Sequence, residues 1–321
     1  YIWQVTQDKV LFRSLEKALK FSTYFIHVNG TIGGEYMSRN TSFYFPAAFE
    51  MLSEYNEDAK SIAAFMRTSV KSQLSVGLSM MDVFNYMPML NNYLFANDNF
   101  SRIKLPKSLP FSKNGEIIFS DAGVVVKTTD NYQAFLGLSK GGILKVYCKN
   151  TKSLAHSDCG YYNQVGAAII SSQSFNPFMN WEKDENSFNI LAPFVFVNQT
   201  TLSSWRFLAF RIFSLTLGRH PLVSKYLKKL LVKLLVTRRK EATAKLSRKV
   251  TFTENSIYVE DEIRDPLKNR FDSPFWWAPK FSSIHMGSSR YFQPDELCLP
   301  QSKKIKGTSN SYVWNSTETL D

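Results

Sequence analysis

The hydrophobic pattern of this chain changes near residue 100, and that change limits the folds available to it. Up to about residue 100, apolar side chains recur every three to four positions, as in Leu11, Leu15 and Leu19, which predicts amphipathic helices. After Asn97-Asp98-Asn99 the sequence turns to short β-rich runs bounded by Gly and Asp. Many strands without intervening helices predict an antiparallel sandwich and not a parallel sheet. The runs are 117–119, 123–127, 132–136, 143–147, 188–197 and 250–263.

Local signals refine this division into a helical domain over 1–105 and a β-domain over 106–321. Pro46 suits the first turn of a helix, and Asn56 is a plausible cap for the helix that follows it. Near the end of the chain, 312–314 is a candidate strand. The sequence contains no run of eighteen uncharged apolar residues, so it predicts no membrane-spanning helix. Its N-terminus lacks the layout of a signal peptide.

One segment carries the net positive charge of the chain. Residues 205–250 contain thirteen Lys and Arg against a single acid, Glu241. Within it, 221–240 has an apolar face opposite its lysines, which predicts an amphipathic helix inserted in the β-domain. This helix either packs on its own protein or contacts a polyanion or an anionic membrane surface. It shows no helix-turn-helix or RNA-recognition pattern, so we expect no specific nucleic-acid partner.

A glycine-rich loop holds the densest group of reactive side chains. Residues 29–41 contain three glycines, which let a backbone bend and approach another group closely. Glu35, Tyr36, Arg39 and Asn40 in the same loop can together grip and deprotonate a polar ligand. The alternative is a connecting loop with a Glu/Arg pair on its surface.

Three motifs follow one another along the chain: Gly33–Thr41 with Tyr44-Phe45-Pro46 beyond it, then Ser157–Tyr161, and then Ser288–Gln293. Together they resemble the heparinase II/III-like proteins, particularly those associated with bacterial surface-polysaccharide clusters. The resemblance implies an α+β fold, in which the helical hairpins of residues 1–105 end an (α/α) toroid and a large antiparallel β-sandwich follows. Because the chain starts at Tyr1 in helical sequence, we expect an upstream portion that completes the toroid.

The resemblance also implies a chemistry. Characterised members of the family are polysaccharide lyases that cleave uronate-containing chains by β-elimination. An Asn, Gln or Arg neutralises the uronate carboxylate in these enzymes, while Tyr or His residues move protons. In this chain Glu35 matches the family loop most plainly, Asn40 or Arg39 would bind the carboxylate, and Tyr36 or Tyr44 would transfer the proton. Arg39-Asn40-Thr41 stands where family lyases often have a Tyr-His pair, so the alternative is a non-catalytic protein that binds acidic polysaccharide.

Two further groups are candidate binding residues on the β-domain. His156 and Asp158 would share one face of a strand, and some family members bind a divalent metal on the sandwich through similar groups. The alternative for this pair is a hydrogen-bonded turn. Trp276 and Trp277 either stack on sugar rings or belong to the core. The same two alternatives, substrate binding and packing, apply to Arg290.

Overall fold

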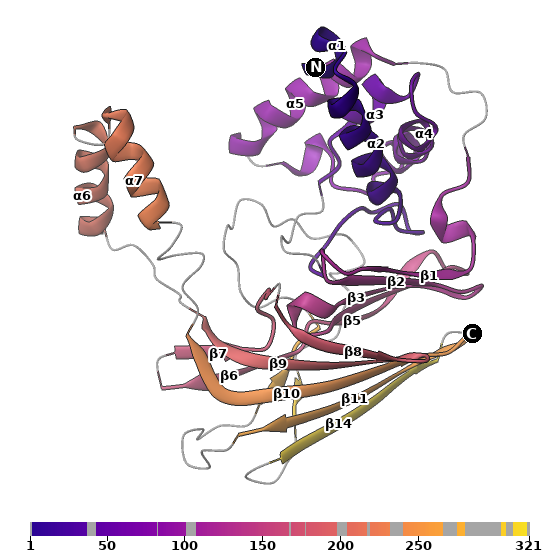
Figure 1. The fold of residues 1–321 in the computed structure, drawn as a ribbon, viewed down its shortest axis with the longest axis vertical. Helices are drawn as coiled ribbons and strands as arrows, with labels where there is room; N and C mark the ends of the chain where they lie inside the picture. Colours follow the sequence, from indigo (N-terminus) through magenta and orange to yellow (C-terminus); the bar gives the residue numbers. More distant parts are fainter. Residues whose placement is uncertain are drawn as a thin grey trace.

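The described residues form three stacked layers. A computed structural model describes residues 2–36, 43–81, 83–100, 107–166, 168–176, 178–197, 204–216, 219–231, 240–265, 275–279, 303–305 and 311–319. A helical layer contains the N-terminal part of the chain, a five-stranded sheet lies in the middle, and a nine-stranded sheet forms the third layer (Figure 1).

The helical layer contains five α-helices. They are α1 (Ile2–Thr6), α2 (Lys9–Thr23), α3 (Pro46–Leu52), α4 (Glu57–Lys71) and α5 (Val83–Asp98). Both predicted helix starts are confirmed. Pro46 is the first residue of α3, and the Asn56 side chain accepts hydrogen bonds from the first-turn N–H groups of Asp58 and Ala59 in α4. Among the described helices of the whole chain, none has the length and hydropathy needed to cross a bilayer.

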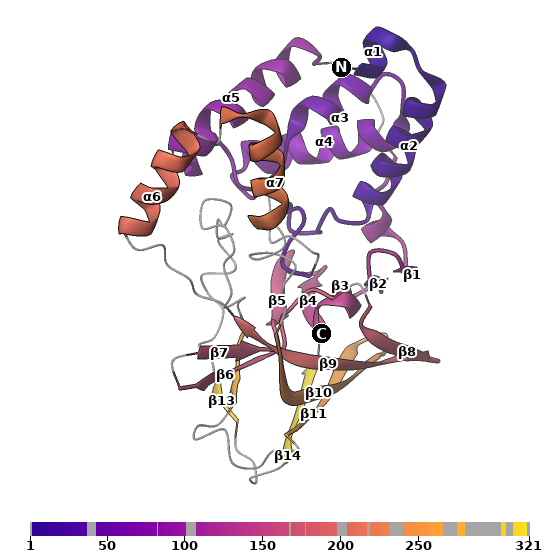
Figure 2. The same ribbon diagram turned by 60° about the vertical axis from the view of Figure 1, so that its left-hand side comes forward.

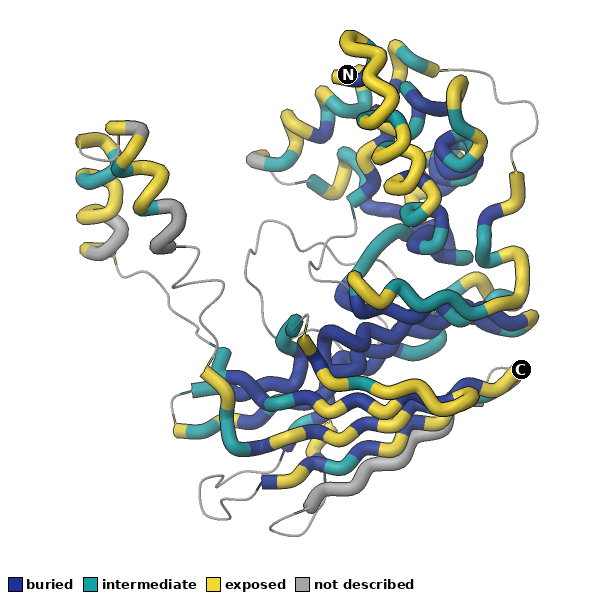
Figure 3. Tube along the Cα trace, viewed as in Figure 1, coloured by how far each residue is buried: buried dark blue, intermediate teal, exposed yellow. Residues whose placement is uncertain are grey.

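The middle sheet is an antiparallel meander in which sequence neighbours are also spatial neighbours. Its strands are β1 (Gly115–Phe119), β2 (Val124–Thr128), β3 (Tyr132–Gly137), β4 (Ile143–Cys148) and β5 (Ser153–Asp158). Every residue of β3 and β4 is buried, because the helical layer covers one face of the sheet and the nine-stranded sheet covers the other (Figure 3). This burial explains why the sequence of these strands is apolar at successive positions.

The larger sheet is also antiparallel, and its two longest strands are β9 and β10. β7 and β8 pair with different halves of one edge of β9, and β10 pairs with its other edge. Figure 2 shows β6, β7 and β13 toward one end of this sheet and β8 toward the other. The strands are β6 (Tyr161–Val165), β7 (Ala168–Ser171), β8 (Asn180–Asp184), β9 (Ser187–Val197), β10 (Glu241–Phe252), β11 (Ser256–Arg264), β12 (Trp276–Trp277), β13 (Lys303–Lys304) and β14 (Ser311–Thr319).

Alternation along β3 divides the core in two. Leu136 points to the nine-stranded sheet and joins a large cluster with residues such as Phe188 and Leu246. Its neighbour Phe135 points to the helical layer and packs with Phe25. Burying one such side chain contributes about 1.5–3 kcal/mol, so the two faces of β3 hold all three layers together.

The predicted helical toroid is wrong. The described helices number seven and form no toroid, and the β-rich remainder consists of a five-stranded sheet and a larger, partly curved sheet. The helical periodicity of the first hundred residues is real, but α2, α3, α4 and α5 pack on one another as a small cluster above the middle sheet (Figure 1). Periodicity reports the apolar face of each helix and carries no information on whether helix pairs close into a ring.

Two helices interrupt the larger sheet between β9 and β10. They are α6 (Ser204–Leu215) and α7 (Pro221–Leu231). The amphipathic pattern predicted over 221–240 coincides with α7 in its first half, and residues 232–239 lie outside the described part. The pattern did not predict α6. Both helices stand apart from the three layers in Figure 1.

Candidate functional site

The glycine loop, which we define as residues 25–36, folds back on itself between α2 and the middle sheet. His27 N donates to the Thr31 carbonyl, which closes the turn. Gly30 and Gly33 have φ values of 89° and 68°, in the left-handed region that glycine adopts without steric cost. The loop is therefore a closed turn within the connection between α2 and α3.

Contacts from two layers hold the glycine loop in place. Gln133 of β3 accepts a hydrogen bond from Val28 N and donates one to the Ile26 carbonyl, each at 3.0 Å. On the other side, the Ser69 hydroxyl of α4 donates to the Gly30 carbonyl. The loop thus lies on the outer face of the middle sheet, beneath the helices.

Glu35 is buried and ion-paired rather than exposed to a ligand. Its Oε2 lies 2.7 Å from the Lys145 ammonium of β4, and the Cys159 thiol donates to the same oxygen at 3.4 Å. Burial, and then the negative charge of Glu35, raise the pKa of Cys159 well above its usual value. The thiol therefore stays protonated and is a poor nucleophile.

Tyr36 is held by a second buried network. Its hydroxyl lies 2.7 Å from His27 Nε2, while His27 Nδ1 lies 2.6 Å from the Thr31 hydroxyl. The Tyr36 ring stacks on Phe135 with centroids 4.5 Å apart. Burial, with a smaller effect from Tyr147, raises the pKa of Tyr36 well above its usual value, so this phenol is not a proton acceptor at neutral pH.

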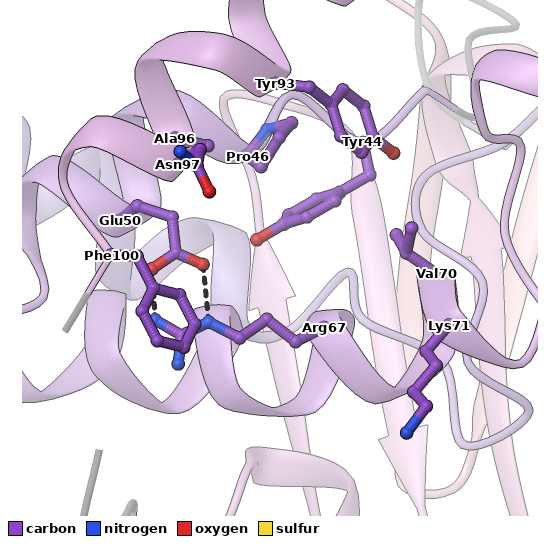
Figure 4. A pocket seen from close by; sticks show the side chains of 10 residues that line it. All are labelled: Tyr44, Pro46, Glu50, Arg67, Val70, Lys71, Tyr93, Ala96, Asn97 and Phe100. Carbon is purple, nitrogen blue, oxygen red and sulfur yellow. Dashed lines mark hydrogen bonds and ion pairs between the residues drawn. The ribbon is translucent and has the colours of Figure 1, made fainter. Parts of the chain in front are cut away.

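A pocket of about 280 Å³ opens in the helical layer near Tyr44 (Figure 4). A buried ion pair forms part of its wall, because Arg67 of α4 donates from both Nε and Nη2 to the two carboxylate oxygens of Glu50 on α3; the Nε bond is 2.7 Å. The Phe100 ring covers this guanidinium at 4.1 Å. The lining residues are Tyr44, Pro46, Glu50, Arg67, Val70, Lys71, Tyr93, Ala96, Asn97 and Phe100.

Two phenol groups of the pocket lack hydrogen-bond partners among the described residues. They belong to Tyr44, which precedes α3, and to Tyr93 of α5. Burial is the main reason that the pKa of Tyr44 is raised well above its usual value; Glu50 and Tyr93 add to the shift, and Arg67 opposes it. A protonated phenol can donate a hydrogen bond or a proton, but cannot remove one. Leaving a buried hydroxyl unpaired costs about 1–3 kcal/mol, which is unusual without a compensating role.

The structure separates the predicted catalytic residues. Glu35 and Tyr36 lie on the middle sheet, whereas Tyr44 belongs to a different cluster within the helical layer. Arg39 and Asn40 lie outside the described residues. Of the described residues in the predicted group, only Tyr44 lines the pocket in the helical layer.

The predicted metal pair lies on β5, where other contacts occupy Asp158. One carboxylate oxygen accepts from Gly160 N at 2.7 Å, and the other lies 2.9 Å from the Arg248 guanidinium. His156 is half-buried with its ring 6.4 Å from that of Trp277. In the part of the chain that the structure describes, no three His, Cys, Asp or Glu side chains are grouped so as to hold a metal.

The predicted tryptophans form the short strand β12, which pairs with β6 and β13. Trp277 is buried beside the main core. Trp276 is half-exposed and stacks on Tyr162 with centroids 6.5 Å apart. Only Trp276 of the two therefore offers ring surface to a ligand, and Arg290 lies outside the described residues.

Sequence reasoning missed Glu50, Arg67 and Lys145. A signal existed for Glu50, because its charge interrupts the apolar sequence of a short helix, PAAFEML. Lys145 stands within the apolar run of β4, and its charge was an equally clear indication of a buried partner. The partner itself, Glu35, could not be named, because nothing local links positions so far apart.

Comparisons with known proteins give little to set beside this geometry. No family model and no curated protein matches the chain. Among solved structures, the crystal structure of a 4-alpha-glucanotransferase from Thermococcus litoralis matches with a TM-score of 0.32 and 8% identity, over 72% of this chain and 36% of that one. The chain thus spans about a third of that protein, and similarity at this level supports no inference about substrate or reaction.

Proposed function

We propose that this chain binds an acidic polysaccharide as a non-catalytic, heparinase II/III-like protein, and that the Tyr44 pocket receives one of its sugar rings. The observation that carries the proposal is the lining of this pocket, where Tyr44 and Tyr93 stand beside the Asn97 amide and the Phe100 ring, and where both tyrosines have a buried hydroxyl without a partner among the described residues. Sugar rings present hydroxyl groups at their edges and apolar C–H faces, and this lining complements both.

Size and charge support a uronate-type sugar. The pocket volume, about 280 Å³, is just below the roughly 300–1,000 Å³ typical of ligand sites, so it suits a single ring. Lys71, an exposed lining residue, supplies a cation for a carboxylate, while Arg67 is already engaged by Glu50. The rest of the polysaccharide would lie outside the pocket.

The protonation states of Tyr36 and Tyr44 favour polysaccharide binding over cleavage by β-elimination. A lyase needs a base to remove the proton next to the uronate carboxylate, and the raised pKa values of Tyr36 and Tyr44 make both poor bases. Lyase activity is the second candidate function, favoured by one observation: a tyrosine, the residue type that protonates the leaving glycosidic oxygen in such lyases, lines a pocket that suits a single sugar ring. In that case the base would come from residues outside the described part.

Calorimetric titration with uronate oligosaccharides tests the proposal. We expect Tyr44→Phe and Tyr93→Phe each to weaken binding by about tenfold, because each change removes one hydrogen bond. Tyr44→Phe should leave the stability of the protein at or above that of the wild type, because it removes an unpaired buried hydroxyl. Tyr86→Phe, on α5 but outside the pocket, is the matched control and should bind normally.

Two results would contradict the proposal. One is no retention of any uronate oligosaccharide at low salt, and the other is wild-type affinity in both pocket variants. An absorbance rise from unsaturated uronate that disappears in Tyr44→Phe would instead support the lyase candidate.

A further inference from the structure

The segment from Ser204 to Leu231, which we call the basic hairpin, has few contacts with the rest of the protein. It contains α6 and α7, and neither helix takes part in the extensive packing between described elements. Figure 1 shows both helices apart from the helical layer and the sheets, and Figure 2 keeps α6 at the rim of the molecule. Among the side chains of α6 and α7 that the structure describes, none is buried, whereas most amphipathic helices are stabilised by burying one face.

α6 exposes an apolar stripe. Trp205, Leu208, Ile212 and Leu215 are spaced by three and four positions, which places them on one helix face. Their exposed fractions are 80%, 46%, 56% and 54%. A soluble helix normally turns such a face toward a core, and a stripe of this kind in solvent marks an interaction surface.

The charge of the basic hairpin has one sign. Its sequence contains six Lys and Arg and no Asp or Glu. Among the described side chains, Arg211, Arg219 and Lys225 are exposed. On α7 the exposed Leu222 and Tyr226 lie one turn apart and flank Lys225, so cations and apolar groups are interleaved on both helices.

We propose that the basic hairpin docks on an anionic lipid bilayer, with the α6 stripe inserted at the interface and the cations at the headgroup level. An interfacial helix needs apolar and aromatic side chains on one face together with Lys and Arg, and no acidic residues to repel anionic lipid. Nucleic acid would neutralise the cations and leave Leu208, Ile212 and Leu215 in water, so it fits the surface less well.

Vesicle binding by the complete chain tests this assignment. We expect co-sedimentation with vesicles of phosphatidylcholine and phosphatidylglycerol, much weaker binding to phosphatidylcholine alone, and a loss of binding as salt is raised. Brominated lipid should quench the fluorescence of the bound protein, and Trp205→Phe should remove most of that quenching while binding persists.

Two sets of variants separate charge from apolar insertion. Arg211→Gln/Arg219→Gln/Lys225→Gln should lower the partition coefficient by roughly tenfold to a hundredfold. Trp205→Ser/Ile212→Ser should lower it by at least about tenfold. Two controls should bind as the wild type does: Arg13→Gln/Lys17→Gln/Lys20→Gln removes three exposed cations from α2, and Val83→Ser/Met87→Ser removes two exposed apolar groups from α5.

Several outcomes would overturn the proposal. One is equal binding to neutral and anionic vesicles, and another is no binding to either. Self-association of the chain that the stripe variant abolishes, without vesicle binding, would assign the surface to a second copy. Binding to duplex DNA without binding to vesicles would assign it to nucleic acid. Because the hairpin stands outside the packed layers, circular dichroism of both hairpin variants should match the wild type.

Discussion

Arg248 is fully buried and yet charged, and three strands and a loop depend on it. Its guanidinium contacts Asp261 of β11 at 2.7 and 2.8 Å and Asp158 of β5 at 2.9 Å, and it donates to the Gly142 carbonyl at 2.6 Å. The Tyr161 hydroxyl donates to Asp261 at 2.5 Å. Arg248 is therefore a cross-link between the two sheets, and its removal would leave two carboxylates buried without a cation.

We predict that Arg248→Met lowers the free energy of unfolding by about 3–5 kcal/mol, the usual cost of removing one member of a buried ion pair. The matched control is Arg264→Gln, which breaks the exposed pair with Glu262 and should leave the free energy of unfolding close to that of the wild type. Urea denaturation measures both. Similar losses in the two variants would show that the buried network does not hold the sheets together.

His27 makes the stability of the protein depend on pH. Burial, and then the positive charge of Lys145, lower the pKa of His27 well below 6.5. Below pH 6.5 the unfolded chain therefore binds a proton at this histidine, whereas the folded chain does not. The contribution of His27 to the free energy of unfolding is complete above that pH and is lost as the pH falls.

We predict that the free energy of unfolding falls by up to about 1.4 kcal/mol per pH unit below pH 6.5 because of His27. His27→Gln should be less stable at pH 7, because it loses the contacts to Thr31 and Tyr36. The slope of its free energy of unfolding against pH should be shallower by the contribution of one proton. His220→Gln, which removes an exposed histidine, is the matched control. Parallel slopes in His27→Gln and the wild type between pH 7 and pH 5 would exclude this role.

At the scale of elements, the glycine loop is pressed against the end of β3. A Cβ added at Gly137 would lie 2.6 Å from the Tyr36 carbonyl oxygen, which is backbone and cannot turn aside. The contact fixes the height of the loop above the middle sheet, and with it the ion pair of Glu35 and Lys145.

We predict that Gly137→Ala lowers the free energy of unfolding by about 1–3 kcal/mol, as overpacking does elsewhere. Gly115→Ala, at the start of β1, places its Cβ in open space and is the matched control; it should be neutral or slightly stabilising. Thermal unfolding followed by circular dichroism compares the two. Equal midpoints would mean that the loop can move away from the sheet without cost.

For the whole molecule, the sequence predicted elements better than architecture. Strands at 132–136 and 143–147 correspond to β3 and β4, and the capped helix after Asn56 is present, because each depends on neighbours within a few positions. The toroid was wrong, because ring closure depends on how helices pair over long distances.

The candidate site was likewise predictable in its local features and not in its long-range contacts. The loop of Glu35 and Tyr36 was recognisable as a glycine-rich turn, since φ requirements are local. Its burial was not, because Lys145 and Gln133 come from strands far along the chain. The Tyr44 pocket likewise forms from three helices, and no single stretch of sequence contains enough of it to reveal a cavity.

The position of α6 and α7 between β9 and β10 has a consequence for how related chains can diverge. Val195 of β9 and Glu241 of β10 are paired where the chain leaves and re-enters the sheet. The two strands therefore stay paired at this point whatever sequence connects them. Descendants of this sequence could lengthen, trim or exchange the excursion without refolding the scaffold. The bilayer docking proposed for this excursion would then evolve separately from the sugar binding proposed for the helical layer.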